Sequence, residues 1–392
     1  MKQKIYFDNA ATSPVRKEVF EEMQKYFVEL YGNPSSVYEI ARTSKKALDV
    51  ARKQVAAAIN SEVNEIFFTS GGTEADNWAL KGIAEAYKDK GNHIITSSIE
   101  HPAIRNTCQY LEKQGIEVTY LPVDKYGIIS LEDLKKAIKK ETILISIMFA
   151  NNEIGTIQPI KEIGTIAKEN KVLFHTDAVQ AVGHIPVNVK DMNIDLLSLS
   201  GHKLRAAKGV GALYVRSGVK IRAILHGGAQ ERKRRAGTEN LPGIVGLGKA
   251  IELCCEEMPA KIEKLTKLRD MLIEKVLQEI PHTSLNGHAQ NRLPGNANIS
   301  FEFIEGESLL LRLDMKGICV SSGSACSSAS LDPSHVLLAI GLPHELAHGS
   351  MRMTLEDNTK DEVNMFLKEL VPIVQSLRDM SPLYEEFLNG SV

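Results

Sequence analysis

Short apolar runs alternate with longer amphipathic stretches through the first half of the chain. Short apolar runs are typical of buried strands, and apolar residues spaced three and four apart are typical of helices. We predict strands at 65–69, 93–97, 117–122, 143–149, 172–176, 194–199 and 209–215. Helices are predicted at 15–31, 44–59, 73–88, 102–114, 131–139 and, after Pro159, up to Asn170. This alternation predicts a mostly parallel sheet covered by helices on both faces.

The second half of the chain has a different pattern. A long amphipathic helix is predicted at 256–280, because apolar residues such as Leu265, Leu268 and Leu272 recur at helical spacing. After it we expect strands at 296–303, 318–320 and 350–355 and helices at 308–316 and 360–380. We therefore predict an α/β protein of two domains. The large domain spans 15–255, and a smaller α+β domain combines 1–14 with 256–392.

Several polar residues follow the predicted strands directly. Ligands of open α/β sheets bind at the carboxyl ends of the strands. The groups found there are Gly71-Gly72-Thr73, His101, Asn152, Asp177 and Lys203. We expect these side chains to form one site.

Lys203 follows the apolar run 194–199 within the sequence Ser200-Gly201-His202-Lys203. Burying an ammonium group is costly and lowers its pKa, so a lysine at this position is a candidate for Schiff-base chemistry. The alternative is an ordinary surface lysine at the end of a strand.

The glycine turn before the helix at 73–88 could bind an anion. Gly71 and Gly72 let the backbone approach closely, and the start of a helix favours a phosphate. Thr73 could instead be a simple helix cap. Asp177 ends an apolar strand, where a carboxylate can hold a ring nitrogen protonated, as pyridoxal phosphate requires. The combination of Asp177, Lys203 and a phosphate loop is more specific than any one of them.

Two further residues are candidates for chemistry. Cys326 lies in the small-residue sequence SSGSACSS, which suits a mobile and reactive thiol. Cys319, in the apolar sequence GICV, fits a buried and inert cysteine better. Arg352 could bind a substrate carboxylate through two hydrogen bonds, or form a structural ion pair.

Composition excludes several classes of protein. The 392 residues are 43% hydrophobic and 24% charged with a net charge of −2, as in ordinary globular proteins. This charge gives no general reason to bind nucleic acid or a membrane, and the basic run 232–235 is interpreted as a solvated face or an anion-binding loop. We find no export signal and no membrane-spanning segment. The five cysteines lack zinc spacing, so we expect a cytoplasmic protein.

The sequence His344-Glu345-Leu346-Ala347-His348 matches the HExxH signature of zinc hydrolases. Gly341, Pro343 and Gly349 would limit its helix to little more than a turn, and we identify no third ligand. We therefore predict no metal site here.

With these residues in place, the chain resembles the cysteine desulfurases of the class V aminotransferase family. The resemblance runs almost end to end. It is carried by YFDNAAT at 6–12, NPSS at 33–36, FTSGGTEADN at 68–77, EHPA at 100–103, NNEIG at 151–155, HTDAVQ at 175–180, SGHK at 200–203, RRAGTEN at 234–240, SSGSACSS at 321–328 and ELAHGSMRMT at 345–354. The cysteine loop resembles the branch that serves nitrogen fixation and iron–sulfur assembly.

The resemblance implies a fold-type I pyridoxal phosphate enzyme. In that family pattern Lys203 forms the Schiff base with the cofactor and later moves protons. Asp177 holds the pyridine nitrogen, and Gln180 holds the phenolic oxygen. His101 stacks on the ring and assists acid–base steps.

The same resemblance implies a phosphate site made by Gly72, Thr73, Ser200 and His202. Thr238 would reach this phosphate from the other subunit of a homodimer. These roles rest on the family pattern alone.

The family pattern also implies how the substrate is handled. Asn152 would contact the cofactor, and Asn152 and Arg352 would hold the carboxylate of L-cysteine. Cys326 would attack the substrate sulfur, keep it as a persulfide and release alanine. The sulfur would pass to an acceptor protein, such as an iron–sulfur scaffold with transient cluster contact at Cys326.

Four positions depart from the family pattern. Tyr38 replaces a frequent histidine, and Ala41 and Ala229 each replace a glycine. Ala206-Ala207 replaces Gly-Pro beside Lys203, which alters the freedom of that backbone. Alternatives within the same chemistry are a selenocysteine lyase and another β-lyase. A scaffold or regulator without turnover is the alternative that these alanines suggest.

Overall fold

The computed structural model describes residues 4–322 and 333–390. Its larger sheet has seven strands in the order β2-β8-β7-β6-β5-β3-β4. Their bounds are β2 Ile66–Thr69, β3 His93–Ser97, β4 Glu117–Leu121, β5 Thr142–Ser146, β6 Leu173–Asp177, β7 Leu196–Ser200 and β8 Gly211–Val215. Only β8 runs against its neighbours β2 and β7. The prediction of an α/β fold with a mostly parallel sheet is confirmed.

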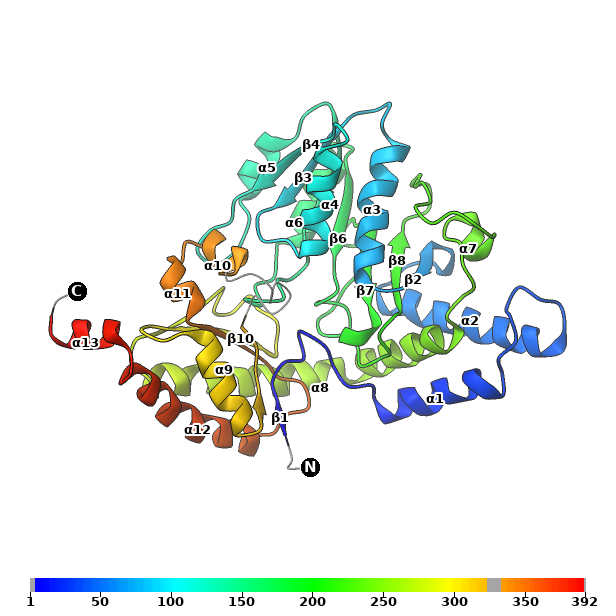
Figure 1. The fold of residues 1–392 in the computed structure, drawn as a ribbon. Helices are drawn as coiled ribbons and strands as arrows, with labels where there is room; N and C mark the ends of the chain where they lie inside the picture. The colour runs from blue at the N-terminus through cyan, green and yellow to red at the C-terminus, as the bar shows by residue number, and fades with distance from the viewer. Residues whose placement is uncertain (1–3, 323–332, 391–392) are drawn as a thin grey trace.

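Helices cover both faces of this sheet (Figure 1). They are α1 Lys17–Val28, α2 Glu39–Ala58, α3 Gly72–Ala86, α4 Pro102–Glu112, α5 Leu131–Ala137 and α6 Ile160–Glu169. Ile94 and Leu144 pack in one core with residues of α3 and α4. The next residues along the same strands, Ile95 and Ile145, pack in a second core with residues of α1, α2 and α6. Because successive strand residues point to opposite faces, both faces of these strands are buried.

A third core belongs to the second half of the chain and the N-terminal segment. Here β10 Asn296–Phe301 lies between β9 Thr283–Leu285 and β12 Ser350–Thr354, and the strands are antiparallel. The helices α9 Gly306–Met315 and α12 Lys360–Arg378 cover this sheet. The first strand, β1 Ile5–Tyr6, pairs in parallel with β11 Ile318–Cys319. Residues from the two ends of the chain therefore share this core.

Helix α8, Leu241–Glu279, begins much earlier than the predicted start at 256. Asn240 caps it by accepting a hydrogen bond from the amide of Gly243. Gly248 packs so closely on α2 that a side-chain carbon there would lie 2.7 Å from Cα of Ala51. Glycines lower helix propensity, so tertiary packing rather than local sequence sets this start. Figure 1 shows α8 running under both parts of the molecule.

The sequence pattern did not predict four short helices. They are α7 Gln230–Lys233, α10 His335–Ala339, α11 His344–His348 and α13 Pro382–Leu388. Glu231 and Arg232 in α7 have positive φ angles, so no regular helical period exists there to detect. Within the described residues, no helix is both long and apolar enough to cross a membrane.

Candidate active site

Lys203 lies just beyond the carboxyl end of β7, in the 3₁₀ turn Gly201–Lys203. Its Nζ donates hydrogen bonds to the carbonyl oxygens of Ala10 and Ala11, at 2.5 and 2.6 Å. The backbone oxygen of Lys203 is hydrogen-bonded to Nε2 of His184 at 3.1 Å. The lysine is therefore held at both its backbone and its amine, and it is not a freely moving surface side chain.

Asp177 is the last residue of β6, the strand beside β7. Its Oδ1 accepts a hydrogen bond from the amide of Val179 at 2.9 Å. Burial raises the pKa of Asp177, and the nearby His101, the Val179 amide and Lys203 oppose that shift. A cation placed against this carboxylate would lower its pKa further and stabilise its ionised form.

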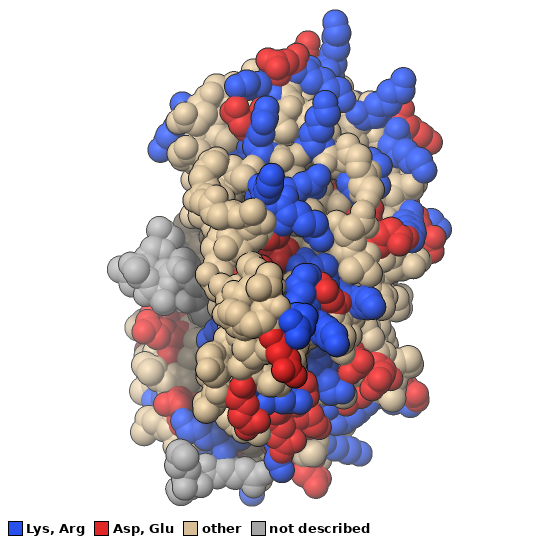
Figure 2. All heavy atoms as spheres, turned by 90° about the vertical axis from the view of Figure 1, so that its right-hand side faces the viewer, with Lys and Arg blue, Asp and Glu red and all other residues tan. Residues whose placement is uncertain are grey.

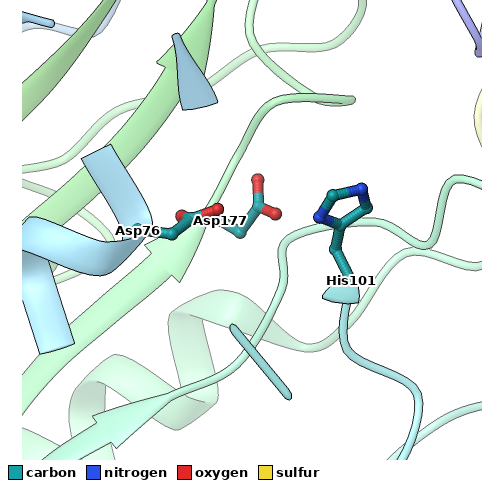
Figure 3. Close-up of side chains that lie close together, drawn as sticks. All are labelled: Asp76, His101 and Asp177. Atoms are coloured by element: carbon teal, nitrogen blue, oxygen red, sulfur yellow. The ribbon is translucent and has the colours of Figure 1, made fainter. Parts of the chain in front are cut away.

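His101 precedes α4 and caps it. Its Nδ1 accepts a hydrogen bond from the amide of Ala103 at 3.1 Å, which leaves Nε2 to carry the proton of the neutral ring. Burial lowers the pKa of His101, while Asp177 raises it and Lys203 lowers it. The imidazole faces the Asp177 carboxylate, with Asp76 beyond it (Figure 3). A ring nitrogen of His101 and one carboxylate oxygen each of Asp76 and Asp177 lie within 4.8 Å of one another.

The turn from β2 into α3 packs against the ends of β6 and β7. A side-chain carbon added to Gly72 would lie 2.8 Å from Val179 and 3.5 Å from Cβ of Ser200. A residue other than glycine would therefore collide with Val179 at this position. Thr73 is exposed in the first turn of α3. The first amides of a 15-residue helix thus lie beside the Ser200 side chain, an arrangement that suits a phosphate.

His202 and Gln180 both contact the N-terminal segment. Nδ1 of His202 is hydrogen-bonded to Oγ1 of Thr12 at 3.1 Å, and burial lowers the pKa of His202 to about 4. Nε2 of Gln180 donates to the carbonyl oxygen of Ala10 at 3.2 Å. The segment from Ala10 to Thr12 therefore lies over the residues at the ends of β6 and β7.

Arg352 of β12 is buried and links the N-terminal segment to the site. Its Nη2 contacts Oδ1 of Asp8 at 2.8 Å, and its Nη1 donates to the backbone oxygen of Asn152 at 3.1 Å. Its Nε is buried without a hydrogen-bond partner among the described residues. An unpaired buried guanidinium N–H is costly, so this position is prepared for an acceptor such as a carboxylate.

The comparisons with known proteins agree with this geometry. Residues 5–366 match the model of the class V aminotransferase family. A protein of Methanosarcina thermophila named cysteine desulfurase IscS is 65% identical over 380 residues, which cover 97% of this chain and 94% of the relative. A Clostridium botulinum protein of the same name is 59% identical and covers 100% of this chain and 99% of its own.

This chain belongs to the cysteine desulfurases. Among solved structures, one described as a NifS-like protein has a TM-score of 0.90 and 40% identity, covering 96% of this chain and all (100%) of its own. Another, described as SspA in complex with cysteine, has a TM-score of 0.80 and 40% identity, with coverage of 90% and 99%. The family resemblance stated from the sequence is confirmed, and so is the prediction that the chain is an enzyme of the cysteine desulfurase class. Desulfurases of class V are pyridoxal phosphate enzymes.

The described structure does not test the site roles of two predicted residues of this desulfurase. Cys326 lies outside the described residues, although the loop that carries it begins beside Arg352, whose backbone pairs with Ser321. Thr238 lies in the segment between α7 and α8 and is exposed in the single chain. Their roles stay predictions.

The HExxH sequence forms α11, a helix of only five residues. Among the described residues, His344 and His348 belong to no group of three or more side chains that could hold one metal ion. The expectation of no metal site here stays a prediction.

Sequence reasoning missed the contacts that the N-terminal segment makes with the site. The carbonyl oxygens of Ala10 and Ala11 accept from Lys203, and the backbone oxygen of His202 accepts from Ser13 at 2.7 Å. Asp76 was missed as well, although it stands in the quoted sequence FTSGGTEADN. A polar residue in the second turn of a helix whose other inward residues are apolar is the signal that could have found it.

Proposed function

We propose that this desulfurase binds pyridoxal phosphate and converts L-cysteine to L-alanine, leaving the sulfur as a persulfide on Cys326. The observation that carries the proposal is the convergence of Lys203, Asp177 and His101 at the carboxyl ends of strands of one sheet. An amine, a buried carboxylate and an imidazole are the groups this chemistry needs, and the family supplies the cofactor class.

The residues around this point fit the cofactor. Asp177 would bind the protonated ring nitrogen, and Gln180 the phenolic oxygen. His101 would cover the ring, and Lys203 would bind the aldehyde carbon and move protons at the substrate Cα. When bound, the cofactor withdraws electrons from the substrate and makes its Cα–H acidic.

The phosphate would lie at the start of α3. The amides of Gly72 and Thr73 would bind it together with the Ser200 hydroxyl and the His202 ring. Gly72 supports this role, because a side chain there would press on Val179 at 2.8 Å. The neutral state of His202 at physiological pH leaves the ring one N–H to donate.

Arg352 and Asn152 would hold the carboxylate of L-cysteine, with Asn152 also against the cofactor. The unpaired Nε of Arg352 supports this role, since it lacks an acceptor among the described residues. The Cys326 thiolate would form an S–S bond with the substrate sulfur as the Cβ–S bond breaks. The freed carbon takes up a proton, and alanine leaves.

The proposal includes a homodimer in which Thr238 completes the phosphate site of the partner. Figure 2 faces the end of the molecule with α7 and the turn between α1 and α2, where uncharged surface lies between basic and acidic side chains. Large apolar side chains are exposed on α1 and on the turn that follows it: Phe20, Phe27, Val28, Tyr31 and Val37. Exposed apolar groups of this kind favour a protein interface.

The persulfide sulfur would pass to an acceptor protein, for which an iron–sulfur scaffold is the proposed class. The relatives named IscS support this choice. We propose a cytoplasmic enzyme that acts without binding nucleic acid or a membrane. Transient contact of Cys326 with a cluster belongs to the same proposal.

The test adds L-cysteine to purified, cofactor-loaded protein and measures alanine together with the mass of the Cys326 peptide. Wild type should form alanine and a sulfur adduct on that peptide. Cys326→Ala should keep the cofactor absorbance and lose alanine formation, whereas the matched control Cys319→Ala should keep both. Alanine production by Cys326→Ala at the wild-type rate would overturn the mechanism. Parallel assays with selenocysteine and cysteine sulfinate separate the related lyases.

A further inference from the structure

A second buried carboxylate lies beside Asp177. Asp76, in the second turn of α3, has only 1% of its surface exposed. Its Oδ1 has no hydrogen-bond partner among the described residues. Figure 3 shows its carboxylate next to that of Asp177, and an oxygen of each lies within 4.8 Å of the other. Two like charges in one buried site cannot both be stable without compensation.

A chain of hydrogen bonds crosses the sheet toward Asp76. Oγ of Ser146 lies 2.9 Å from Nδ1 of His175, and Nε2 of His175 lies 3.0 Å from Oγ of Ser198. The Ser198 hydroxyl in turn stands near the Asp76 carboxyl group and lowers its pKa. Three neighbouring strands, β5, β6 and β7, supply the three residues of this chain.

His175 is neutral in this chain. Burial lowers the pKa of His175 to about 3, so the ring has one donor and one acceptor nitrogen. If Ser198 donates to Asp76, it accepts from Nε2–H of His175, and Nδ1 accepts from Ser146. Oδ1 of Asp76 has no hydrogen-bond partner among the described residues, so it is the position left for a proton.

The surroundings of the two carboxyl groups differ in charge. Asp177 faces His101 and Lys203 and also accepts from the Val179 amide. Asp76 faces the carboxyl groups of Asp177 and Glu100. Burial and both of these groups raise its pKa well above its ordinary value, and the Ser198 hydroxyl opposes that shift only in part. The groups that stabilise a negative charge are therefore gathered mainly on Asp177.

We propose that Asp76 is a positioning residue of this site: of the two neighbouring carboxyl groups it is the one that carries a proton, which leaves Asp177 as the single negative charge. The significance of that charge for catalysis rests on the proposed function, because a cationic ring nitrogen at Asp177 would use it. The protonation itself is a property of the protein without cofactor, and it can be measured there.

Infrared spectroscopy of the cofactor-free protein tests the proposal through the carbonyl stretch of a protonated carboxylic acid. Asp76→Asn is nearly the same size and cannot ionise, and Asp177→Asn is its matched control. The wild-type-minus-Asp76→Asn difference spectrum should contain one such band, sensitive to D₂O. The wild-type-minus-Asp177→Asn spectrum should lack it. Taking differences removes the band of Glu100, whose pKa burial raises to about 8.

Two outcomes would overturn the proposal. A band lost in Asp177→Asn and kept in Asp76→Asn would assign the proton to Asp177, and no change in either variant would mean that neither group carries it. If Asp76→Asn fails to fold, wild-type protein labelled with ¹³C in the aspartate carboxyl groups replaces it. The acid band should then shift with the label, and an unshifted band would contradict the proposal. Because no cofactor or cysteine is present, failure here is separate from failure as a desulfurase.

Discussion

Nζ of Lys203 lies 2.5 Å from the carbonyl oxygen of Ala10, although the two residues are 193 positions apart in the chain. The segment from Asp8 to Ser13 contacts the site again through Arg352, Gln180 and His202. The N-terminal residues therefore form part of the wall of the active site. They hold the lysine amine through backbone oxygens, which no side-chain substitution removes.

Replacing Lys203 by alanine should lower alanine formation from L-cysteine by a factor of about 10² to 10⁴, the usual contribution of a positioned acid–base group, or more. The cofactor absorbance should shift as well, because the amine that binds the aldehyde is gone. Lys208→Ala is the matched control, since Lys208 is an exposed lysine on the same loop. Turnover by Lys203→Ala within tenfold of the wild type would contradict the assignment.

Replacing Arg352 by lysine should raise KM for L-cysteine by roughly 10- to 100-fold, because one hydrogen bond to a charged group contributes about 1.5–3 kcal/mol. Steady-state kinetics measures this change. Asp8→Asn keeps the shape of the ion-pair partner and separates the two roles of Arg352. If Asp8→Asn raises KM as much as Arg352→Lys does, the only role of Arg352 is to order the N-terminal segment.

Removing one partner of the ion pair between Arg52 and Glu231 should lower the free energy of unfolding strongly. Both guanidinium Nη atoms contact the carboxylate at 2.7 Å, and the side chains are only 7% and 2% exposed. Glu231→Ala leaves a buried charge without its partner, so urea unfolding should show a loss of about 3–5 kcal/mol. Asp49→Ala, which breaks the exposed Lys45–Asp49 pair, should cost less than about 1 kcal/mol. Equal losses in both variants would be inconsistent with this view.

Glu100 should make stability depend on pH. Burial raises its pKa to about 8 from 4.5, so its contribution is complete below about 4.5 and is lost as the pH rises through about 8. Between these values the free energy of unfolding should fall by up to about 1.4 kcal/mol per pH unit for this group. Glu100→Gln cannot ionise and should flatten the slope.

Urea unfolding at several pH values between 5 and 9 measures the Glu100 effect. Part of the slope should persist in Glu100→Gln, because burial raises the pKa of Glu153 to about 7. Glu345→Gln, at an exposed position of α11, is the control and should keep the wild-type slope. A Glu100→Gln slope equal to that of wild type would refute the assignment.

The sequence predicted the sheet and the residues at its strand ends, because apolar runs followed by polar residues are local signals. Asp177 and Lys203 could be placed at the same edge of the sheet for this reason. Asp177 ends β6 and Lys203 follows β7, and these two strands are adjacent. The hydrogen bonds of Ala10 and Ala11 could not be predicted, since a backbone oxygen leaves no mark in residue type. The chain of hydrogen bonds through His175 depends on the order of the strands, so it could not be predicted either.

Long-range packing also explains the error at α8. The start at Leu241 depends on close contact between Gly248 and Ala51 of α2, and local propensity opposed it. The division into 15–255 and a smaller domain from 1–14 and 256–392 stays a prediction. Residues of α8 pack in the cores of both parts, with Leu247 against the large sheet and Leu272 in the core of the second half of the chain.

The pairing of β1 with β11 sets an order of assembly during protein synthesis. Ile5 leaves the ribosome long before its partner Ile318. Closing so long a loop is slow, so the parallel sheet can form while β1 waits. Phe7, fully buried against Phe366 in the finished protein, stays exposed until then. The segment that carries β1 can therefore take its place in the core only after β11 has been made.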